Sequence, residues 1–220
     1  MNRPAGARRT ATYEDLLAVP DRLVAEILDG ELHTSPRPTP RHAHATTGLA
    51  GDLSGPFDRG RGGPGGWWIL AGPELHFGDD VAVPDLAGWR RTRLPEMPSE
   101  AFFTLAPDWV CETLSPSTER IDRGTKLALY AREGVAHIWL VNPISETLEA
   151  YRLEHGRWLL VVTQPVTWPR GSSRSRPWNS NCGGCGADPS PADRPVASPR
   201  RTRLTLQDGR AATAGADVVS

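Results

Sequence analysis

Apolar residues recur with two different periods between residues 12 and 163, and each period predicts a different kind of element. Apolar side chains spaced by four predict a helix over residues 41–58. A second helix is predicted over 119–133, because Ser and Thr residues precede it and a glycine follows it. A capping box that begins at Thr12 predicts a short helix that continues through residue 19.

Short apolar or alternating runs bounded by Gly, Pro and Asp predict the strands. These runs cover residues 23–28, 31–34, 67–70, 74–77, 81–83, 86–89, 109–114, 136–141, 148–152 and 158–162. Strands that alternate with two long helices are typical of an α/β domain with a mixed sheet. We therefore expect one domain over residues 12–163, preceded by a flexible N-terminus over residues 1–11.

The composition changes abruptly after residue 163. Residues 1–163 contain 17 basic and 22 acidic residues, a balance of −5, whereas residues 164–220 contain 8 basic and 4 acidic residues, a balance of +4. The second part is rich in Pro, Gly and Ser and keeps no regular period, so we predict a largely disordered tail. The tail also has a composition that a frameshift between about residues 163 and 172 would explain. Its Cys182 and Cys185 lack the further ligands that a structural zinc site needs.

The net charge of −1 excludes the class of proteins that bind nucleic acid through a positive charge spread over the whole surface. No run approaches the roughly 18 apolar residues of a membrane span, and no apolar segment follows the N-terminal arginines as in a secretory signal. Three cysteines do not make a disulfide framework. We therefore expect a cytoplasmic protein with no membrane contact.

Three acidic residues occur where the pattern predicts buried strands, namely Glu26, Asp85 and Glu112. A buried carboxylate costs several kcal/mol unless it is paired or coordinated. Each residue could instead face solvent, because alternate side chains of a strand point outward. If the three carboxylates converge, they form a hard oxygen site suited to Mg²⁺ or Mn²⁺.

Lys126 is the single lysine among 25 basic residues. It lies on the helix that follows the Glu112 strand, and a helix after a strand packs back over it. Its amine could therefore reach the same carboxylates, or it could form a surface pair with Asp122 four residues earlier.

Five motifs carry further information: Pro84-Asp85-Leu86, the run 107–118 around Glu112, the run 26–32, the run 122–126 with Tyr130, and the run 134–143. Together they resemble the Uma-type restriction endonuclease family of the PD-(D/E)XK nuclease superfamily. The resemblance covers about residues 12–163. It implies a restriction-endonuclease-like core, in which a mixed central sheet is flanked by helices.

The resemblance also implies the site residues. Asp85 and Glu112 would hold the metal ion, Mg²⁺ or Mn²⁺, with Glu26 as a further acidic contributor. Leu114 occupies the position where the superfamily usually has its lysine, so the resemblance points to Lys126 instead. Asn142, where the family usually has Asp, is a departure from the pattern.

The implied chemistry is hydrolysis of phosphodiester bonds, with DNA as the expected partner and a homodimer suited to cutting both strands. Candidate contacts to nucleic acid are Arg90, Arg91, Arg93, Arg120, Arg123 and His42, although each could equally belong to a solvated edge. Two other functions stay open. One is a degenerate member that binds nucleic acid or protein without catalysis, and the other is a small-molecule metalloenzyme on the same fold.

Overall fold

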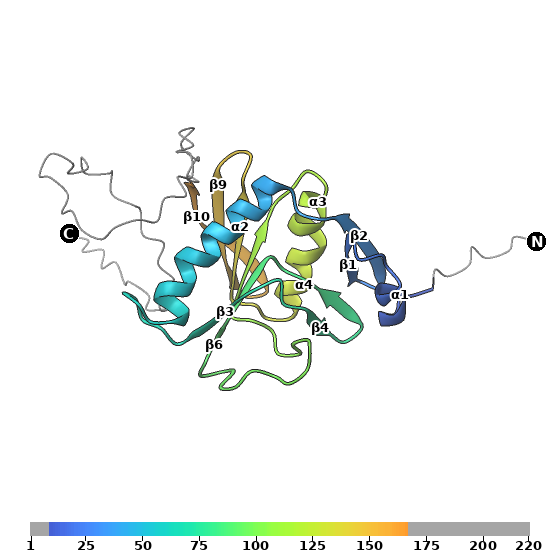
Figure 1. Cartoon of the computed structure of the whole chain (residues 1–220), viewed down its shortest axis with the longest axis horizontal. Coiled ribbons are helices and arrows are strands. Elements are labelled where there is room, and N and C mark those ends of the chain that lie inside the picture. Colours follow the sequence, from blue (N-terminus) through green and yellow to red (C-terminus); the bar gives the residue numbers. More distant parts are fainter. Residues whose placement is uncertain (1–8, 167–220) are drawn as a thin grey trace, which may run out of the picture. The chain divides into compact units, whose positions relative to one another are not determined.

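Two sheets organise residues 9–166, which are the residues that the computed structural model describes (Figure 1). Residues 1–8 of the predicted N-terminus and residues 167–220 of the predicted tail lie outside the described residues, and so do the two cysteines of the tail. The frameshift hypothesis concerns this part of the chain and stays a prediction.

The larger sheet has the strand order β10-β9-β8-β7-β6-β3. Its strands are β3 (Trp67–Ala71), β6 (Leu86–Arg90), β7 (Trp109–Thr113), β8 (His137–Asn142), β9 (Thr147–Glu154) and β10 (Arg157–Pro165). The smaller sheet has the order β2-β1-β5-β4, formed by β1 (Leu23–Leu28), β2 (Glu31–Pro36), β4 (Leu75–Phe77) and β5 (Asp80–Ala82). The strand β10 continues past residue 163, where the sequence pattern ends the domain.

The central pair β7–β8 is parallel, whereas every other pair of strands in the two sheets is antiparallel. A parallel pair needs a crossover connection. Here the crossover is the helical run α3 (Glu119–Ile121), a π-helical segment η2 (Asp122–Lys126) and α4 (Leu127–Arg132). The prediction of a mixed α/β sheet with flanking helices is therefore confirmed.

The two faces of the larger sheet are covered by different elements. On one face, Thr46 of α2 (Pro40–Leu53) is hydrogen-bonded to Thr113 of β7. On the other face, Val110 of β7 and Ile138 of β8 pack with Tyr130 of α4 in the main apolar cluster. Figure 1 shows the β1–β2 hairpin beside α3 and α4, so the smaller sheet extends this second covering layer.

Both predicted long helices contain a π-helical segment that the apolar spacing does not reveal. Beyond α2, the segment η1 (Ser54–Asp58) contains Pro56, which has no N–H to donate to an α-helical bond. The N–H of Arg59 instead bonds to the carbonyl of Ser54. In the second helix, η2 carries Lys126 at its end, and π-helical turns are frequent at functional sites.

The predicted capping box is confirmed. The capping box opens α1 (Tyr13–Leu17), with the Thr12 hydroxyl accepting from the N–H of Asp15 and the Asp15 carboxylate accepting from the N–H of Thr12. The turn between β1 and β2 uses Asp29 and Gly30, whose φ angles of 51° and 74° suit an Asp-Gly hairpin.

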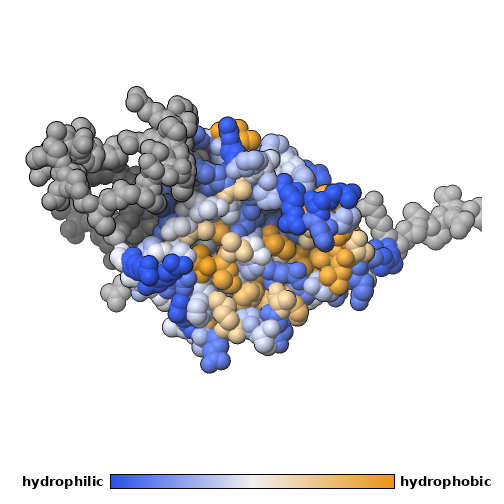
Figure 2. All heavy atoms as spheres, in the orientation of Figure 1, coloured by the Kyte–Doolittle hydropathy of each residue, from blue (hydrophilic) through white to orange (hydrophobic). Residues whose placement is uncertain are grey.

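The face seen in Figure 2 carries hydrophilic side chains around separate apolar patches. Among the helices of residues 9–166, none has the length and apolar character that crossing a membrane requires.

Candidate active site

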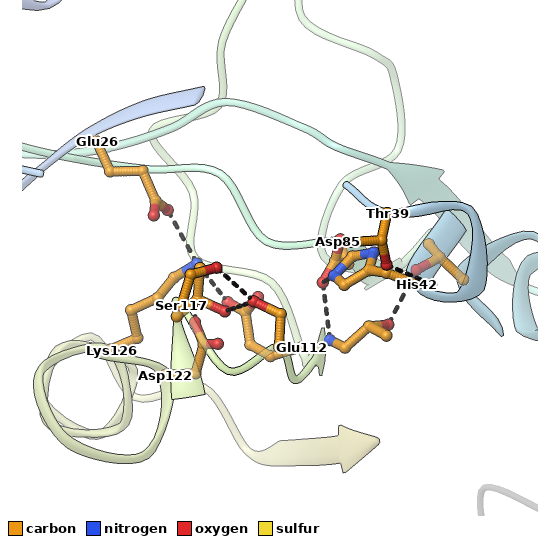
Figure 3. A network of polar contacts seen from close by, with 12 residues as sticks. Glu26, Thr39, His42, Asp85, Glu112, Ser117, Asp122 and Lys126 are labelled. Carbon is orange, nitrogen blue, oxygen red and sulfur yellow. Dashed lines mark hydrogen bonds and ion pairs between the residues drawn. The ribbon is translucent and has the colours of Figure 1, made fainter. Parts of the chain in front are cut away.

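Three carboxylates surround the amine of Lys126 (Figure 3). The Nζ atom lies 2.8 Å from Glu112 Oε1, 2.9 Å from Glu26 Oε1 and 3.8 Å from Asp122 Oδ1. Lys126 is 3% exposed and Glu112 is 2% exposed, so these charges are removed from water. We call Glu26, Glu112, Asp122 and Lys126 the lysine cluster.

The lysine cluster is assembled from three elements that are distant in sequence. Glu112 lies in β7, where every residue is buried, and its side chain is on the face covered by α4. Asp122 and Lys126 are the first and last residues of η2, so one turn of helix presents both. Glu26 comes from β1 and is fixed by the N–H of Val83, which donates to Glu26 Oε1 at 2.7 Å.

The two carboxylate oxygens of Glu112 differ in their contacts with the protein. Its Oε1 accepts a hydrogen bond of 2.6 Å from the hydroxyl of Tyr130 and lies 2.8 Å from Lys126 Nζ. Its Oε2 has no hydrogen bond to any residue in the part of the chain that the structure describes. The carboxylate is therefore fixed in orientation with one oxygen left for a ligand.

The carboxylate of Asp85, beside the lysine cluster, also has one oxygen with protein contacts and one without a hydrogen bond in the described residues. Leu86 pairs with Cys111 in the antiparallel register, so the next residues along, Asp85 and Glu112, are neighbours across β6 and β7. Asp85 Oδ2 accepts from the N–H of Thr113 at 2.7 Å and lies 3.3 Å from His42 Nε2. Its Oδ1 has no hydrogen bond to any of residues 9–166.

His42 is brought to the site by the first turn of α2. Thr39 caps this helix, its hydroxyl accepting from the N–H of His42. Burial alone lowers the pKa of His42, but the hydrogen bond and the negative charge of Asp85 outweigh burial, so the pKa lies above its ordinary value.

The carboxylates of the lysine cluster carry more negative charge than Lys126 can balance. Burial, together with the negative charges of the neighbouring Asp122 and Asp85, raises the pKa of Glu112 to about 8 even though Lys126 opposes the shift. Burial also raises the pKa of Asp122 to about 6, again against the effect of Lys126. Burial disfavours the charged form of Lys126, but Glu112 and Glu26 hold the pKa of its amine well above the ordinary value. A further cation beside these carboxylates would be favourable.

Two residues of this site are missing from the sequence-based set of candidate residues. Asp122 fits a plain surface pair with Lys126, yet it is 4% exposed. Tyr130 is completely buried and donates to Glu112. The available signal is their spacing, because Asp122, Lys126 and Tyr130 recur every four residues and so share one side of a helix.

The structure does not bring Arg90, Arg91 and Arg93 to this site. Asp85 precedes β6, whereas Arg90 is its last residue, so the strand separates them by about 17 Å at roughly 3.3 Å per residue. Arg91 is paired with Asp58 at 2.7 Å, and Arg93 is paired with Asp108 at 2.9 Å. The guanidinium of Arg90 lies over the Trp67 ring at 4.6 Å. These arginines therefore lie away from the carboxylates, and their contact with nucleic acid stays a prediction.

Arg120 and Arg123 lie closer, on the helical run that carries Lys126. Arg123 forms two hydrogen bonds with Glu149 of β9, of 2.8 and 2.9 Å, and a third of 2.9 Å with Glu119. Arg120 is exposed and lines a pocket beside β1 and β2. The guanidinium of Arg123 is thus engaged by two carboxylates although its side chain is 34% exposed, whereas Arg120 has no ion pair with another of residues 9–166.

Asp85 and Glu112 are the residues that could hold a metal ion. Within residues 9–166, no three His, Cys, Asp or Glu side chains form a group that could bind a metal by themselves. Mg²⁺ does not require such a group, because it keeps several waters and is commonly bound through one or two carboxylates and substrate phosphates. Two oriented carboxylates, each with one unbonded oxygen, fit that donor set.

Comparisons with known proteins agree with the fold. The Uma2 family model, described as "Putative restriction endonuclease", matches residues 10–175. No curated protein matches the chain. Among solved structures, a "putative nuclease belonging to DUF820" from Anabaena variabilis ATCC 29413 has a TM-score of 0.57 at 21% sequence identity, covering 68% of this chain and 83% of that one. This structure supports the fold, and the family model matches most of the chain. The chain therefore belongs to the Uma2 family.

Proposed function

We propose that this protein is a metal-dependent endonuclease that hydrolyses phosphodiester bonds of DNA. The observation that carries the proposal is the pattern of hydrogen bonds to two neighbouring carboxylates. Asp85 and Glu112 each have one oxygen fixed by protein donors and one oxygen without a hydrogen bond in the described residues. Metal ligands are typically oriented by such hydrogen bonds from surrounding groups. The amine of Lys126 lies next to Glu112, and it would face a phosphate bound there.

Mg²⁺ or Mn²⁺ is the cofactor that these residues would accept. Carboxylate oxygens suit hard divalent cations. Burial, with smaller contributions from neighbouring carboxylates, raises the pKa of Glu112 to about 8, and a bound cation would favour its charged form. When bound, the cation polarises a phosphoryl oxygen and lowers the pKa of its water.

The side chains of the site would position the phosphate and stabilise the charge that develops on it. Asp85 and Glu112 would fix the position of the reacting phosphate relative to the sheet. Lys126, held between Glu26 and Glu112, would stabilise the negative charge that develops on the phosphoryl oxygens. Asp122 would restrict the amine from the other side. Because Lys126 is already ordered, the chain would reorganise little during the reaction.

Cleavage of supercoiled plasmid by the purified full-length protein tests the proposal. Wild type is compared with Asp85→Asn and Lys126→Ala in Mg²⁺, in Mn²⁺ and in EDTA. The exposed Asp79→Asn is the matched control, because it removes the same charge from a turn. We expect wild type and Asp79→Asn to cut, and both site variants and all EDTA reactions to lose at least 100-fold in rate, the scale of losing one electrostatic group.

The same gel separates the competing functions. A well-folded wild type that does not cut in either metal would exclude catalysis and favour the non-catalytic binding function. Cutting that survives in Asp85→Asn would place the active site elsewhere. Nicked circles would indicate one strand cut at a time, whereas direct linearisation would indicate that two copies act together.

A further inference from the structure

The strand β10 forms one edge of the larger sheet and pairs with β9 alone among residues 9–166 (Figure 1). Four consecutive apolar residues in it, from Leu159 to Val162, are each between 41% and 56% exposed. In the part of the chain that the structure describes, no other run of neighbouring large apolar residues is exposed in this way. An edge strand of this kind presents unpaired backbone groups and apolar side chains to another chain.

The other edges of the two sheets differ from β10. On the far side of the larger sheet, β3 packs against α2 and η1. In the smaller sheet, β4 has only three residues, and Phe103 forms backbone hydrogen bonds with Glu74 and His76 beside it. The strand β2 is six residues long and is polar at every position except Leu32 and Pro36. None of these three edges therefore offers an apolar run like that of β10.

The exposed side chains of β10 lie on both faces of the sheet. Leu160 follows Trp158 by two residues and shares its face, and the indole N–H of Trp158 donates to a carbonyl of α4. The register shifts between Leu160 and Val162, so Val161 is the extra residue of a β-bulge. This shift places Val162 on the opposite face, together with Leu159. A molecule docked on one face would leave the other exposed, whereas a strand added at the edge contacts both.

We propose that β10 pairs with β10 of a second copy of this chain, antiparallel across a two-fold axis near Val161, so that the two larger sheets become one. A two-fold axis perpendicular to a sheet presents the same strand to itself in opposite directions, which is the arrangement that antiparallel pairing requires. The apolar run of one copy then lies against that of the other. Arg157 is the one charged residue of β10 and lies at its start, so it meets the uncharged end of the other strand rather than a second arginine.

This pairing ends at two copies, because each copy contributes the same edge and the contact occupies it in both. The nine residues of β10 extend over about 30 Å, at roughly 3.3 Å per residue, and form a narrow contact. We therefore expect a reversible dimer whose fraction rises with concentration, as is usual for small interfaces.

The dimer would place two candidate active sites on the same face of one continuous sheet. Glu112 lies in β7, three strands in from β10. Seven strand spacings of about 4.8 Å, three in each copy and one across the axis, would therefore separate the two copies of Glu112 by about 34 Å. One turn of B-DNA has about this length, so both sites could contact one duplex. This consequence rests on the proposed nuclease function, whereas the interface does not.

Analytical ultracentrifugation of the full-length protein tests the interface without DNA. EDTA is present to exclude association through metal ions, and the concentration is varied over about a hundredfold range. Wild type should pass from monomer to dimer across this range. Val161→Lys and Val161→Glu should each weaken dimerisation at least about tenfold, because each brings like charges together at the axis. The side chain of Val161 is exposed, so both variants should keep the wild-type thermal midpoint.

An equimolar mixture of these two variants provides the sharpest comparison. Lys and Glu then face each other across the axis, so the mixture should dimerise at concentrations where each variant alone is monomeric. Leu17→Lys is the matched control, because it introduces the same charge at a 65% exposed apolar residue of α1. It should dimerise like wild type.

Three results would overturn the interface: a wild type that stays monomeric throughout, equal dimerisation of wild type and Val161→Lys, or a mixture that does not associate. Protection of the β10 amides from hydrogen exchange in a monomeric wild type would also overturn it, since another segment of the same chain would then cover the edge. A plasmid assay in Mg²⁺ separates these results from the proposed function. A dimer that does not cut keeps the interface and removes the nuclease, whereas a monomeric wild type that cuts keeps the nuclease and removes the interface.

Discussion

Lys126 and Glu112 form an ion pair of 2.8 Å in which each side chain is only 3% exposed. Removing two charges from water costs several kcal/mol per ion, and their attraction repays this cost only with good geometry and further hydrogen bonds. Here Glu26 and the hydroxyl of Tyr130 provide those additional contacts. The contribution of each of these two charges to the stability of the protein therefore depends on the presence of the other.

Lys126→Met should destabilise the protein by about 3–5 kcal/mol, because it leaves buried carboxylates without their cation. Glu112→Gln should cost less, since Lys126 keeps Glu26 as a partner. The double variant should be no less stable than Lys126→Met alone. Urea unfolding of all four proteins in EDTA measures the cycle. Additive losses within about 0.5 kcal/mol would show that the two residues are not coupled.

A divalent cation should stabilise the folded protein through Asp85 and Glu112. A ligand at about a hundred times its Kd that binds only the folded state adds about 2.7 kcal/mol to the free energy of unfolding. We expect Mn²⁺ to raise the thermal midpoint of wild type and of Asp79→Asn, and to leave that of Asp85→Asn unchanged. An equal rise in all three proteins would place the cation away from Asp85.

The fold is largely contained in the sequence pattern, because apolar periods and turn residues act locally. The parallel β7–β8 pair and its helical crossover follow from two apolar runs with a helix between them. Glu112 is conspicuous as one acid in an apolar run, and Lys126 as the single lysine. The lysine cluster could therefore be suspected before the structure.

The remaining details depend on distances that no local pattern contains. Spacing alone allows Asp122 and Lys126 to form a surface pair, and only the packing of η2 against β1 and β7 shows that both are buried. Arg90 follows Asp85 closely in sequence but lies at the other end of a strand. Sequence proximity along an extended strand is not proximity in space, which is why Arg90 does not lie beside Asp85.

Arg123→Ala should affect stability rather than DNA binding. Its guanidinium is engaged with Glu149 through two hydrogen bonds and with Glu119 through one. Because the group is partly exposed, the loss should be about 1 kcal/mol. Urea unfolding and duplex anisotropy on the same protein distinguish the two roles, with Arg123→Lys as the charge-retaining variant. Weaker DNA binding at unchanged stability would show that Arg123 releases Glu149 to contact the substrate.

Asp122 should make the metal-free protein less stable as the pH rises. Burial raises its pKa to about 6 in the folded state, from the value of 3.8 that is usual for an aspartate. The folded state therefore binds more protons than the unfolded state between these two values. The contribution of Asp122 is fully favourable below about pH 4 and is lost as the pH rises through 6.

Asp122→Asn keeps the shape of the side chain and removes its ionisation. Relative to wild type, the variant should gain nothing near pH 4 and up to about 3 kcal/mol above pH 6, since two pKa units correspond to roughly that energy. Urea unfolding in EDTA at pH 4.5, 5.5, 6.5 and 7.5 measures the difference, with Asp79→Asn as the exposed control. A difference that stays constant across this range would mean that Asp122 has an ordinary pKa and that Lys126 fully compensates its charge.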